Sequence, residues 1–239
     1  MIWLFDLDNT LHNASLAIFP EISANMNAFL SVYMKKNGDV RLSTEAANQL
    51  RIEYWKRFGA TLLGISKVLD QRARDFLEAA HRFYDLKSLL SAERGLPVLF
   101  RKLPGRKVLL TNSAYRYSAD ILKLLGVHQF FEKHIAIESM RVFGKFEPKP
   151  SGKFFRKLLA MLKVRPEDCV LVEDNIHILK KAKAMGMKTV LVTRYLNRGR
   201  FSQHSYPYPS GRRRAGRPAF IDLKMTSVRR LTHYLERFC

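Results

Sequence analysis

Residues 2–12 read Ile2-Trp3-Leu4-Phe5-Asp6-Leu7-Asp8-Asn9-Thr10-Leu11-His12, and this stretch decides the fold. Its four leading residues are apolar β-forming types without polar alternation, which predicts a strand buried on both faces of a parallel sheet. Asp6 and Asp8 follow at the carboxyl end of that strand, where open α/β sheets bind their ligands. Because side chains two apart along a strand share a face, we expect both carboxylates to point into one crevice.

The crowding of these two carboxylates calls for a compensating charge. Two carboxylates that lie close together repel each other unless a cation or a shared proton balances them. A hard divalent cation such as Mg²⁺, which prefers oxygen ligands, is the natural partner. The alternative is a solvated turn after the strand, a place where Asp and Asn are common.

The composition is that of a globular protein. The chain has 239 residues, of which 47% are hydrophobic, and this length suits one domain or a domain with a large insertion. No apolar run approaches the ~20 residues of a transmembrane helix, and no basic segment precedes a long apolar one. We therefore expect neither a membrane span nor a signal peptide. Cys169 and Cys239 form no metal motif, and Cys169 is expected to be a buried thiol, so a reducing, cytoplasmic location is the expectation.

The formal net charge of +21 allows two interpretations. A basic surface attracts polyanions or phosphorylated substrates. Dispersed basic residues are also often no more than a solvated surface, and their spread along the whole chain favours this second interpretation. Residues 194–217 are rich in arginine, contain no acidic residue and are expected to form a long loop.

Periodicity divides the chain into an α/β part and a helical insertion. Within the insertion, apolar residues at helical spacing predict helices near 20–36, 44–58, 70–81 and 85–100. Strands then alternate with helices, with strands expected at 107–112, 134–137, 168–174, 188–193 and 219–223, and helices at 115–125, 152–163, 176–185 and 227–238. This alternation predicts a doubly wound, parallel, Rossmann-like α/β sheet. We expect a core of residues 1–12 and 100–239 and a helical cap of residues 13–99.

Three further polar sites accompany predicted elements of the core. Thr111 and Asn112 end the second core strand, where a hydroxyl and the next backbone N–H groups can hold phosphate oxygens. Lys149 precedes a predicted helix, and a lysine there can neutralise phosphate charge and orient a nucleophilic carboxylate. Glu173 and Asp174 end another apolar strand and are costly to bury without a cation, which makes them candidate metal ligands. Taken singly, such residues are more often caps, turns or surface residues.

In this order and at these strand ends, the sites resemble the four motifs of the haloacid dehalogenase-like (HAD) superfamily. From motif one to motif four, the matching residues are Asp6 and Asp8, Thr111, Lys149, and Glu173 with Asp174. The helical insertion between the first two motifs resembles the helical cap of that superfamily. The resemblance covers nearly the whole predicted core.

The resemblance implies a two-step phosphoryl transfer. Asp6 is implied to attack phosphorus and form an aspartyl-phosphate, and Asp8 to protonate the leaving oxygen and then to activate water. Thr111 and Lys149 are implied to bind the transferring phosphoryl group, and Asn112 stays a candidate substrate-binding residue from its position after the strand. Dehalogenases of the superfamily lack an acid at the position of Asp8, because a halide leaves without a proton. The presence of Asp8 therefore favours a phosphatase or a phosphomutase.

The resemblance also implies a Mg²⁺ ion. Its implied ligands are a carboxylate oxygen of Asp6, the backbone carbonyl of Asp8, and Asp174. Many relatives carry a further acidic residue four positions after the metal aspartate, and here that position is Ile178. Glu173 is the candidate for the missing oxygen, directly or through water, with Asp174 favoured as the direct ligand.

Residues 3–20, 54–65 and 217–223 are similar to the pyrimidine 5′-nucleotidase family. This similarity implies hydrolysis of nucleoside 5′-monophosphates such as UMP or CMP. Tyr54 and Phe58 would then offer an aromatic face on which a base stacks. Their helical spacing equally suits core contacts within the cap.

Other functions fit the same motifs. A sugar-phosphate or phosphoglycolate phosphatase, or a phosphomutase, would use the same catalytic residues. A nucleic-acid-binding module on this scaffold is the less favoured alternative, because every catalytic position is filled. The expected partner is therefore a small-molecule phosphate ester, with Mg²⁺ as cofactor.

Overall fold

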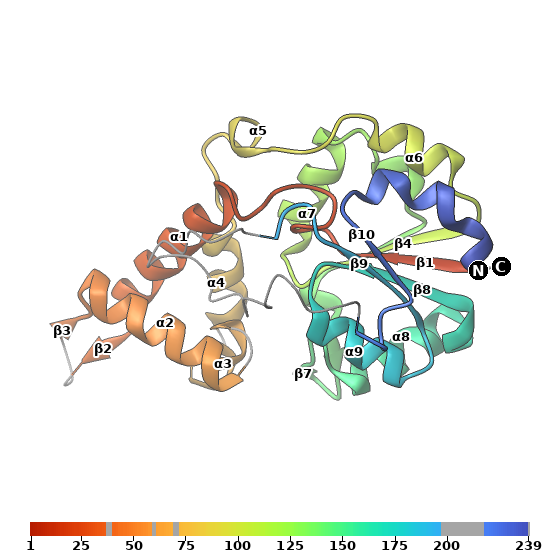
Figure 1. Ribbon diagram of the computed structural model, residues 1–239. Coiled ribbons are helices and arrows are strands. Elements are labelled where there is room, and N and C mark those ends of the chain that lie inside the picture. Colours follow the sequence, from red (N-terminus) through yellow and green to blue (C-terminus); the bar gives the residue numbers. More distant parts are fainter. Residues whose placement is uncertain (37–39, 59–60, 69–71, 197–217, 239) are drawn as a thin grey trace. The chain divides into compact units, whose positions relative to one another are not determined.

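The computed structural model describes residues 1–36, 40–58, 61–68, 72–196 and 218–238 (Figure 1). These residues form two compact units. The first comprises residues 1–14, 90–196 and 218–238, and the second comprises residues 15–89. The domain boundaries expected after residues 12 and 99 stay a prediction. The arginine-rich loop expected over 194–217 lies outside the described residues from residue 197 on.

The first unit is built on a sheet of six parallel strands in the order β10-β9-β8-β1-β4-β5 (Figure 1). The strands are β1 (Ile2–Phe5), β4 (Arg106–Leu110), β5 (Lys133–Ile135), β8 (Cys169–Glu173), β9 (Lys188–Val192) and β10 (Leu223–Met225). The chain builds outward from β1 in both directions, so β1 lies between β4 and β8. Leu4 pairs in register with Val108 on one side and with Leu171 on the other. The doubly wound α/β fold predicted from the sequence is confirmed.

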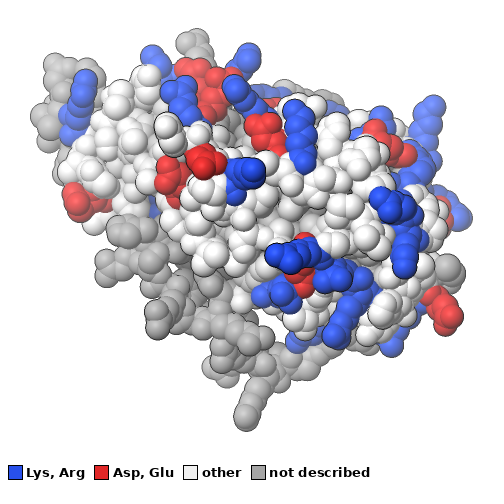
Figure 2. Space-filling model, turned by 90° about the horizontal axis from the view of Figure 1, so that it is seen from above, with Lys and Arg blue, Asp and Glu red and all other residues white. Residues whose placement is uncertain are grey.

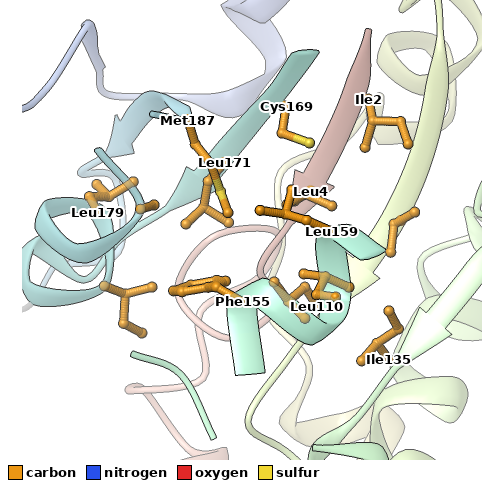
Figure 3. Close-up of a cluster of buried hydrophobic side chains, with 14 of the residues drawn as sticks. Ile2, Leu4, Leu110, Ile135, Phe155, Leu159, Cys169, Leu171, Leu179 and Met187 are labelled. Atoms are coloured by element: carbon orange, nitrogen blue, oxygen red, sulfur yellow. The ribbon is translucent and has the colours of Figure 1, made fainter. Parts of the chain in front are cut away.

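One face of the sheet forms a hydrophobic core with two helices. The α-helices of this unit are α6 (Leu96–Lys102), α7 (Tyr115–Leu124), α8 (Gly152–Leu162) and α9 (Ile176–Ala184). Its 3₁₀ helices span His128–Phe130, Ile137–Ser139, Pro166–Asp168 and Val228–Arg237. Ile2 and Leu4 of β1 lie in one cluster with Phe155 of α8 and Leu179 of α9 (Figure 3). Cys169 belongs to the same cluster as a fully buried free thiol, as predicted.

The opposite face of β1 packs against aromatic rings. The Phe5 ring meets the Phe100 ring of α6 at 5.0 Å between centroids, and the Trp3 ring meets the Phe238 ring at 5.5 Å. All four β1 residues are 1% exposed or less. Burial on both faces is the reason why the first strand shows no polar alternation.

The second unit is helical. Its elements are α1 (Ile18–Tyr33), the short strands β2 (Lys35–Lys36) and β3 (Val40–Arg41), α2 (Thr44–Phe58), α3 (Thr61–Val68), α4 (Ala73–Ala80) and α5 (Leu86–Leu89). Helix α1 packs against α2 and α4, and the Phe29 and Phe76 rings meet edge to face at 5.4 Å. Arg51 of α2 is fully buried, and its guanidinium donates to the side-chain oxygens of Asn27 at 3.1 Å and Asn48 at 2.8 Å.

Three predicted elements differ in the structure. The helix expected over 20–36 ends at Tyr33, because the next residues pair as an antiparallel ribbon of β2 and β3. The region 85–100, for which the sequence offers Gly95 and Pro97 as possible breaks, is divided into α5 and α6, and Gly95 adopts a left-handed φ of 90° just before α6. The strand expected over 219–223 is shifted to β10.

No helix among the described residues is long and apolar enough to cross a membrane. The cytoplasmic location expected from the sequence stays a prediction. On the face shown in Figure 2, Lys and Arg side chains lie in several groups with Asp and Glu among them. This distribution is that of a solvated surface more than of one continuous basic stripe.

Asp222 fastens the chain before β10 to the rest of the sheet. Its Oδ2 atom accepts hydrogen bonds from the backbone N–H of Thr189 at 2.8 Å and from the Thr189 hydroxyl at 3.1 Å. Its Oδ1 atom accepts from the Lys183 ammonium at 2.5 Å. Burial acts to raise the Asp222 pKa, but the bonds from Lys183 and Thr189 outweigh burial, so the pKa lies below its usual value.

Replacing Asp222 by Asn should lower the free energy of unfolding by about 1–2 kcal/mol at neutral pH, because charge-assisted hydrogen bonds are lost. A carboxylate with a lowered folded-state pKa stabilises the fold above its unfolded pKa, and this contribution vanishes as the pH falls further. The difference between wild type and Asp222→Asn should therefore shrink below about pH 4. Urea unfolding at several pH values measures it, with Asp120→Asn as control, and a difference that does not change with pH would contradict this role.

Candidate active site

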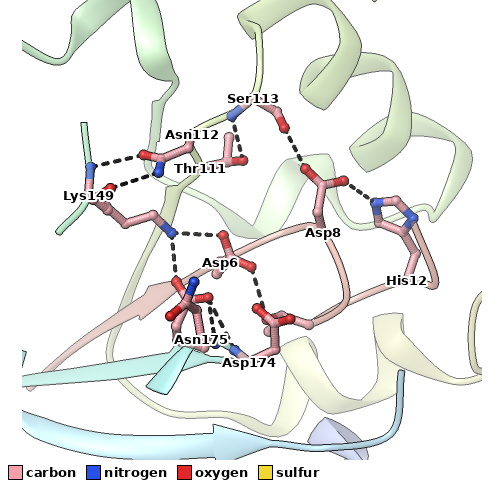
Figure 4. A network of polar contacts seen from close by, with 11 residues as sticks. Asp6, Asp8, His12, Thr111, Asn112, Ser113, Lys149, Asp174 and Asn175 are labelled. Carbon is pink, nitrogen blue, oxygen red and sulfur yellow. Dashed lines mark hydrogen bonds and ion pairs between the residues drawn. The ribbon is translucent and has the colours of Figure 1, made fainter. Parts of the chain in front are cut away.

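The polar residues predicted at strand ends meet at the carboxyl edge of the sheet, within the first unit (Figure 4). Asp6 follows β1, Thr111 follows β4, and Asp174 follows β8, while Lys149 comes from the segment before α8. Because β4 and β8 flank β1, their ends bring these side chains to Asp6. All four residues are at least nine-tenths buried.

A buried lysine joins two carboxylates at the centre of the site. The Lys149 ammonium donates to Asp6 Oδ1 and to Glu173 Oε2, each at 2.8 Å. Asp6 Oδ2 also accepts from the Thr10 hydroxyl at 3.0 Å. Burial and the neighbouring Glu173 carboxylate raise the Asp6 pKa to about 7 even though Lys149 opposes the shift. The pKa of Lys149 is raised, because Asp6 and Glu173 outweigh its burial, so the ammonium stays charged.

Asp8 lies on the other side of the site and has its own partners. Its Oδ2 atom accepts from the Ser113 hydroxyl at 2.5 Å, and its Oδ1 atom accepts from the Tyr117 hydroxyl at 2.6 Å. The Nε2 atom of His12 lies 3.0 Å from Asp8 Oδ1. Burial acts to raise the Asp8 pKa, but His12, Ser113 and Tyr117 outweigh burial and lower it. Asp6 and Asp8 are thus two neighbouring carboxylates whose pKa values are shifted in opposite directions.

The segment after β4 supports the site in two ways. The Thr111 hydroxyl accepts from the backbone N–H of Ser113 at 3.1 Å, which fixes the turn after the strand. The Asn112 side chain accepts from the backbone N–H of Lys149 at 3.0 Å and donates to the Lys149 carbonyl at 2.9 Å. Asn112 therefore holds the backbone that delivers the Lys149 ammonium. The predicted roles of Thr111 and Asn112 in binding substrate stay predictions.

Three buried carboxylates can hold a metal ion. Ligand atoms of Asp6, Glu173 and Asp174 lie within 4.8 Å of one another. Both oxygens of Glu173 already accept hydrogen bonds, Oε2 from Lys149 and Oε1 from the backbone N–H groups of Asp174 at 3.2 Å and Asn175 at 3.1 Å. Both oxygens of Asp6 accept hydrogen bonds as well, from Lys149 and from Thr10, so hydrogen bonding does not rank the three carboxylates. Asp174 as the direct ligand, with Glu173 in support, stays a prediction. The Asp8 carboxylate does not belong to this cluster, so a metal contact of Asp8 would have to come from its backbone.

The residues fit a hard divalent cation. Asp6, Glu173 and Asp174 together carry more negative charge than the single Lys149 ammonium balances. Burial first, and the Glu173 carboxylate second, raise the Asp6 pKa, and a nearby cation would act against both by favouring the ionised carboxylate. Oxygen-only donors suit Mg²⁺ rather than zinc or other metals that prefer nitrogen and sulfur.

Comparison with known proteins decides the family. A model described as "haloacid dehalogenase-like hydrolase" matches residues 2–186. The chain belongs to this family of hydrolases. The broad part of the resemblance inferred from the motifs is thereby confirmed, whereas a place within the pyrimidine 5′-nucleotidase family is not shown.

Individual relatives of this hydrolase are distant. Pyrophosphatase PpaX of Halalkalibacterium halodurans is 26% identical over 195 residues, which are 79% of this chain and 81% of that protein. The structure of an HAD phosphatase from Thermococcus onnurineus superposes with a TM-score of 0.58 at 19% identity, over 98% of this chain and 97% of that one. The L-2-haloacid dehalogenase of Xanthobacter autotrophicus with covalently bound chloropropionic acid gives 0.54 at 16% identity, over 98% of both chains. At these identities the two structures share the fold with this hydrolase and nothing more specific.

Tyr54 and Phe58 belong to the helical unit of this hydrolase. The Tyr54 ring meets the Phe58 ring edge to face at 5.9 Å and is 8% exposed. A Cβ atom added at Gly64 would overlap the Tyr54 ring, so the packing of α3 on α2 depends on a close approach of ring and glycine. The surroundings of Tyr54 are those of a core residue, and the predicted stacking of a base on Tyr54 and Phe58 stays a prediction.

Two residues of the site were not assigned from the sequence. The sequence motifs give no role to His12, which ends the stretch 2–12, or to Tyr117, which lies within the helix expected over 115–125. The spacing of four residues between Asp8 and His12 could have indicated that His12 contacts Asp8, because a tight turn brings residues at that spacing together. Nothing in the sequence separates Tyr117 from the exposed Tyr115, since only the packing of α7 decides which of them faces the site.

Mg²⁺ should raise the thermal unfolding midpoint of the wild-type protein, and EDTA should reverse this effect. A ligand that binds only the folded state stabilises it by about 2.7 kcal/mol at a hundredfold excess over Kd. Asp174→Asn removes one proposed ligand and should lose most of the shift. Asp120→Asn, a carboxylate variant on α7, is the control and should keep the shift. An equal shift in wild type and Asp174→Asn would exclude Asp174 as a ligand.

Proposed function

We propose that this hydrolase is a Mg²⁺-dependent phosphatase that cleaves small phosphate monoesters through an aspartyl-phosphate on Asp6. The observation that carries the proposal is the contact of Lys149 with Asp6 at 2.8 Å in a buried site beside a second, separately held carboxylate, Asp8. The contact with Lys149 suits Asp6 as a nucleophile, and the separate hydrogen bonds of Asp8 suit it as a proton donor and acceptor. When bound, Mg²⁺ would neutralise charge on the phosphoryl oxygens and on Asp6.

In the first step an Asp6 oxygen attacks phosphorus, a P–O bond to Asp6 forms, and the P–O bond to the alcohol breaks. The leaving oxygen takes the proton of the Asp8 carboxyl group, so a neutral alcohol departs. In the second step water attacks phosphorus and gives its proton to the Asp8 carboxylate. Inorganic phosphate leaves, and the Asp6 carboxylate is restored.

The two steps need opposite protonation states of Asp8. Its lowered pKa in the free protein favours the carboxylate, which is the form that accepts a proton from water. A dianionic phosphate ester bound beside Asp8 adds negative charge, and a like charge raises the pKa of a carboxyl group. Substrate binding therefore moves Asp8 towards the protonated form that the first step requires. Asp8 also separates this proposal from dehalogenation, in which no proton is delivered to the leaving halide.

For the substrate we propose nucleoside 5′-monophosphates such as UMP and CMP. The support is the similarity of residues 3–20, 54–65 and 217–223 to pyrimidine 5′-nucleotidases. A second candidate is inorganic pyrophosphate, which the similarity to pyrophosphatase PpaX favours. Sugar phosphates and phosphoglycolate are the remaining members of the test set, because they would use the same catalytic residues.

Phosphate release from UMP, CMP, AMP, phosphoglycolate, glucose phosphates and pyrophosphate tests the function and the substrate together. We expect release that requires Mg²⁺, is abolished by EDTA and by Asp6→Asn, and is fastest with UMP and CMP. Loss in Asp6→Asn should exceed about 10³-fold, since the nucleophile is removed. Fastest release from pyrophosphate or a sugar phosphate would refute the nucleotide substrate and keep the mechanism. Release from none of the compounds, or release that survives Asp6→Asn, would contradict the phosphatase proposal.

A further inference from the structure

We propose that His12 and Tyr117 are positioning residues that hold the Asp8 carboxylate in the orientation from which it exchanges protons with the leaving group and with water. The inference rests on the proposed phosphatase function. It extends that function to two residues outside the four motifs, one in the turn after Asp8 and one on α7.

Donors from separate segments of the chain reach both oxygens of Asp8. Oδ1 accepts from the Tyr117 hydroxyl at 2.6 Å and from His12 Nε2 at 3.0 Å, while Oδ2 accepts from the Ser113 hydroxyl at 2.5 Å. A short polar side chain held at both oxygens has little freedom to rotate about its χ angles. The carboxylate plane is therefore fixed before any substrate arrives.

A tight turn brings His12 back to Asp8. The backbone N–H of Leu11 donates to the carbonyl of Leu7 at 2.9 Å, and Asn9 adopts a left-handed φ of 59°, a conformation that Asn tolerates better than most residues. As a result, the backbones of Asp8 and His12 pair in an isolated β-bridge, which places the two residues side by side. The contact between the two side chains is thus built into the backbone of the catalytic loop (Figure 4).

The surroundings of His12 argue against a role in packing alone, because a buried imidazole nitrogen without a hydrogen bond costs free energy. Its side chain is 0% exposed, and its Nδ1 atom has no hydrogen-bond partner among the described residues. Because the Asp8 oxygen only accepts, Nε2 must carry the hydrogen. The imidazole therefore makes its hydrogen bonds from the nitrogen that faces Asp8 and Tyr117. An apolar side chain would fill the same space without an unpaired buried nitrogen, so the histidine is explained by its contact with Asp8.

Tyr117 completes the arrangement from α7. It is 2% exposed, and its hydroxyl lies 2.6 Å from Asp8 Oδ1 and 3.4 Å from His12 Nε2. Asp8, His12 and Tyr117 thus form a closed triangle of polar atoms. Tyr115, two residues earlier on α7, is 52% exposed and offers a matched tyrosine that does not touch Asp8.

Orientation matters because proton transfer needs a donor and acceptor about 2.6–3.2 Å apart. A displacement of about 1 Å in a reacting group costs on the order of 10²-fold in rate. A mispositioned Asp8 should mainly impair esters whose leaving group needs the proton. This gives a signature that general loosening of the fold does not produce.

Phenyl phosphate and 4-nitrophenyl phosphate are a pair of esters that differ in how much their leaving groups need a proton. They have similar shapes and form the same phospho-enzyme, but nitrophenolate leaves readily without a proton and phenolate does not. The ratio of their kcat/KM values therefore reports proton delivery in the first step alone. Asp8→Asn gives the reference for complete loss of the proton donor.

In Tyr117→Phe we expect kcat/KM to fall at least about tenfold more for phenyl phosphate than for 4-nitrophenyl phosphate. His12→Leu should behave likewise, and His12→Gln should recover part of the loss, because the Gln amide restores an N–H donor. Tyr115→Phe should leave the ratio unchanged. Should Tyr117→Phe fail to fold, which circular dichroism shows, the His12→Leu and His12→Gln pair decides.

Equal losses for the two esters in Tyr117→Phe and His12→Leu, or losses in KM alone, would overturn the positioning role while wild-type turnover and its dependence on Asp6 stand. No phosphate release from either ester by the wild-type protein would overturn the proposed function and this inference together. The two failures are thereby told apart.

Discussion

The buried Lys149 ammonium between Asp6 and Glu173 is the interaction on which the rest of the site depends. Taking one partner out of such a buried arrangement leaves uncompensated charge and costs about 3–5 kcal/mol. The lysine is itself held, since the Asn112 side chain clamps its backbone on both sides. Through these contacts the ends of β1, β4 and β8 and the segment before α8 form one connected network, so the geometry at Asp6 is set by the sheet as a whole.

Charge balance links this network to the chemistry. One lysine does not balance the surrounding carboxylates, and burial together with the neighbouring Glu173 carboxylate raises the Asp6 pKa. A divalent cation held there would complete the balance and favour the ionised form of Asp6 that the proposed mechanism requires. Asp8 is kept apart from that cluster by donors of its own, so two carboxylates two positions apart in sequence can have different tasks. Environments that shift neighbouring pKa values in opposite directions are a general way of assigning nucleophile and acid–base roles.

The sequence predicts the core well because local and long-range signals agree there. An apolar run without alternation at residues 2–5 indicates a strand buried on both faces, and polar residues at successive strand ends must meet at one edge of a parallel sheet. This reasoning predicts that Asp6, Thr111 and Asp174 come together, whereas Lys149, which precedes a helix, was included for its charge and for its place in the motif order. The family comparison confirms the hydrolase class that their order suggested.

The parts that could not be predicted depend on tertiary contacts. The end of α1 at Tyr33 is set by pairing of Lys35–Lys36 with a partner strand, and no local signal separates that pairing from a longer helix. Whether Tyr115 or Tyr117 faces Asp8 follows from the rotation of α7 on the sheet. Tyr54 lies in the segment 54–65 that is similar to pyrimidine 5′-nucleotidases, yet its ring is buried against Gly64. Residue spacing alone does not reveal this packing.

The central claim is that Asp6 carries the phosphoryl group, and the most direct measurement is to find it there. The protein would be mixed with Mg²⁺ and 4-nitrophenyl phosphate, quenched in acid within the first turnovers, digested, and examined by mass spectrometry. The account predicts a phosphoryl adduct on Asp6 that is lost when hydroxylamine cleaves acyl phosphates and that is absent from Asp6→Asn. Turnover without any adduct on Asp6, or an adduct on another residue, would contradict it.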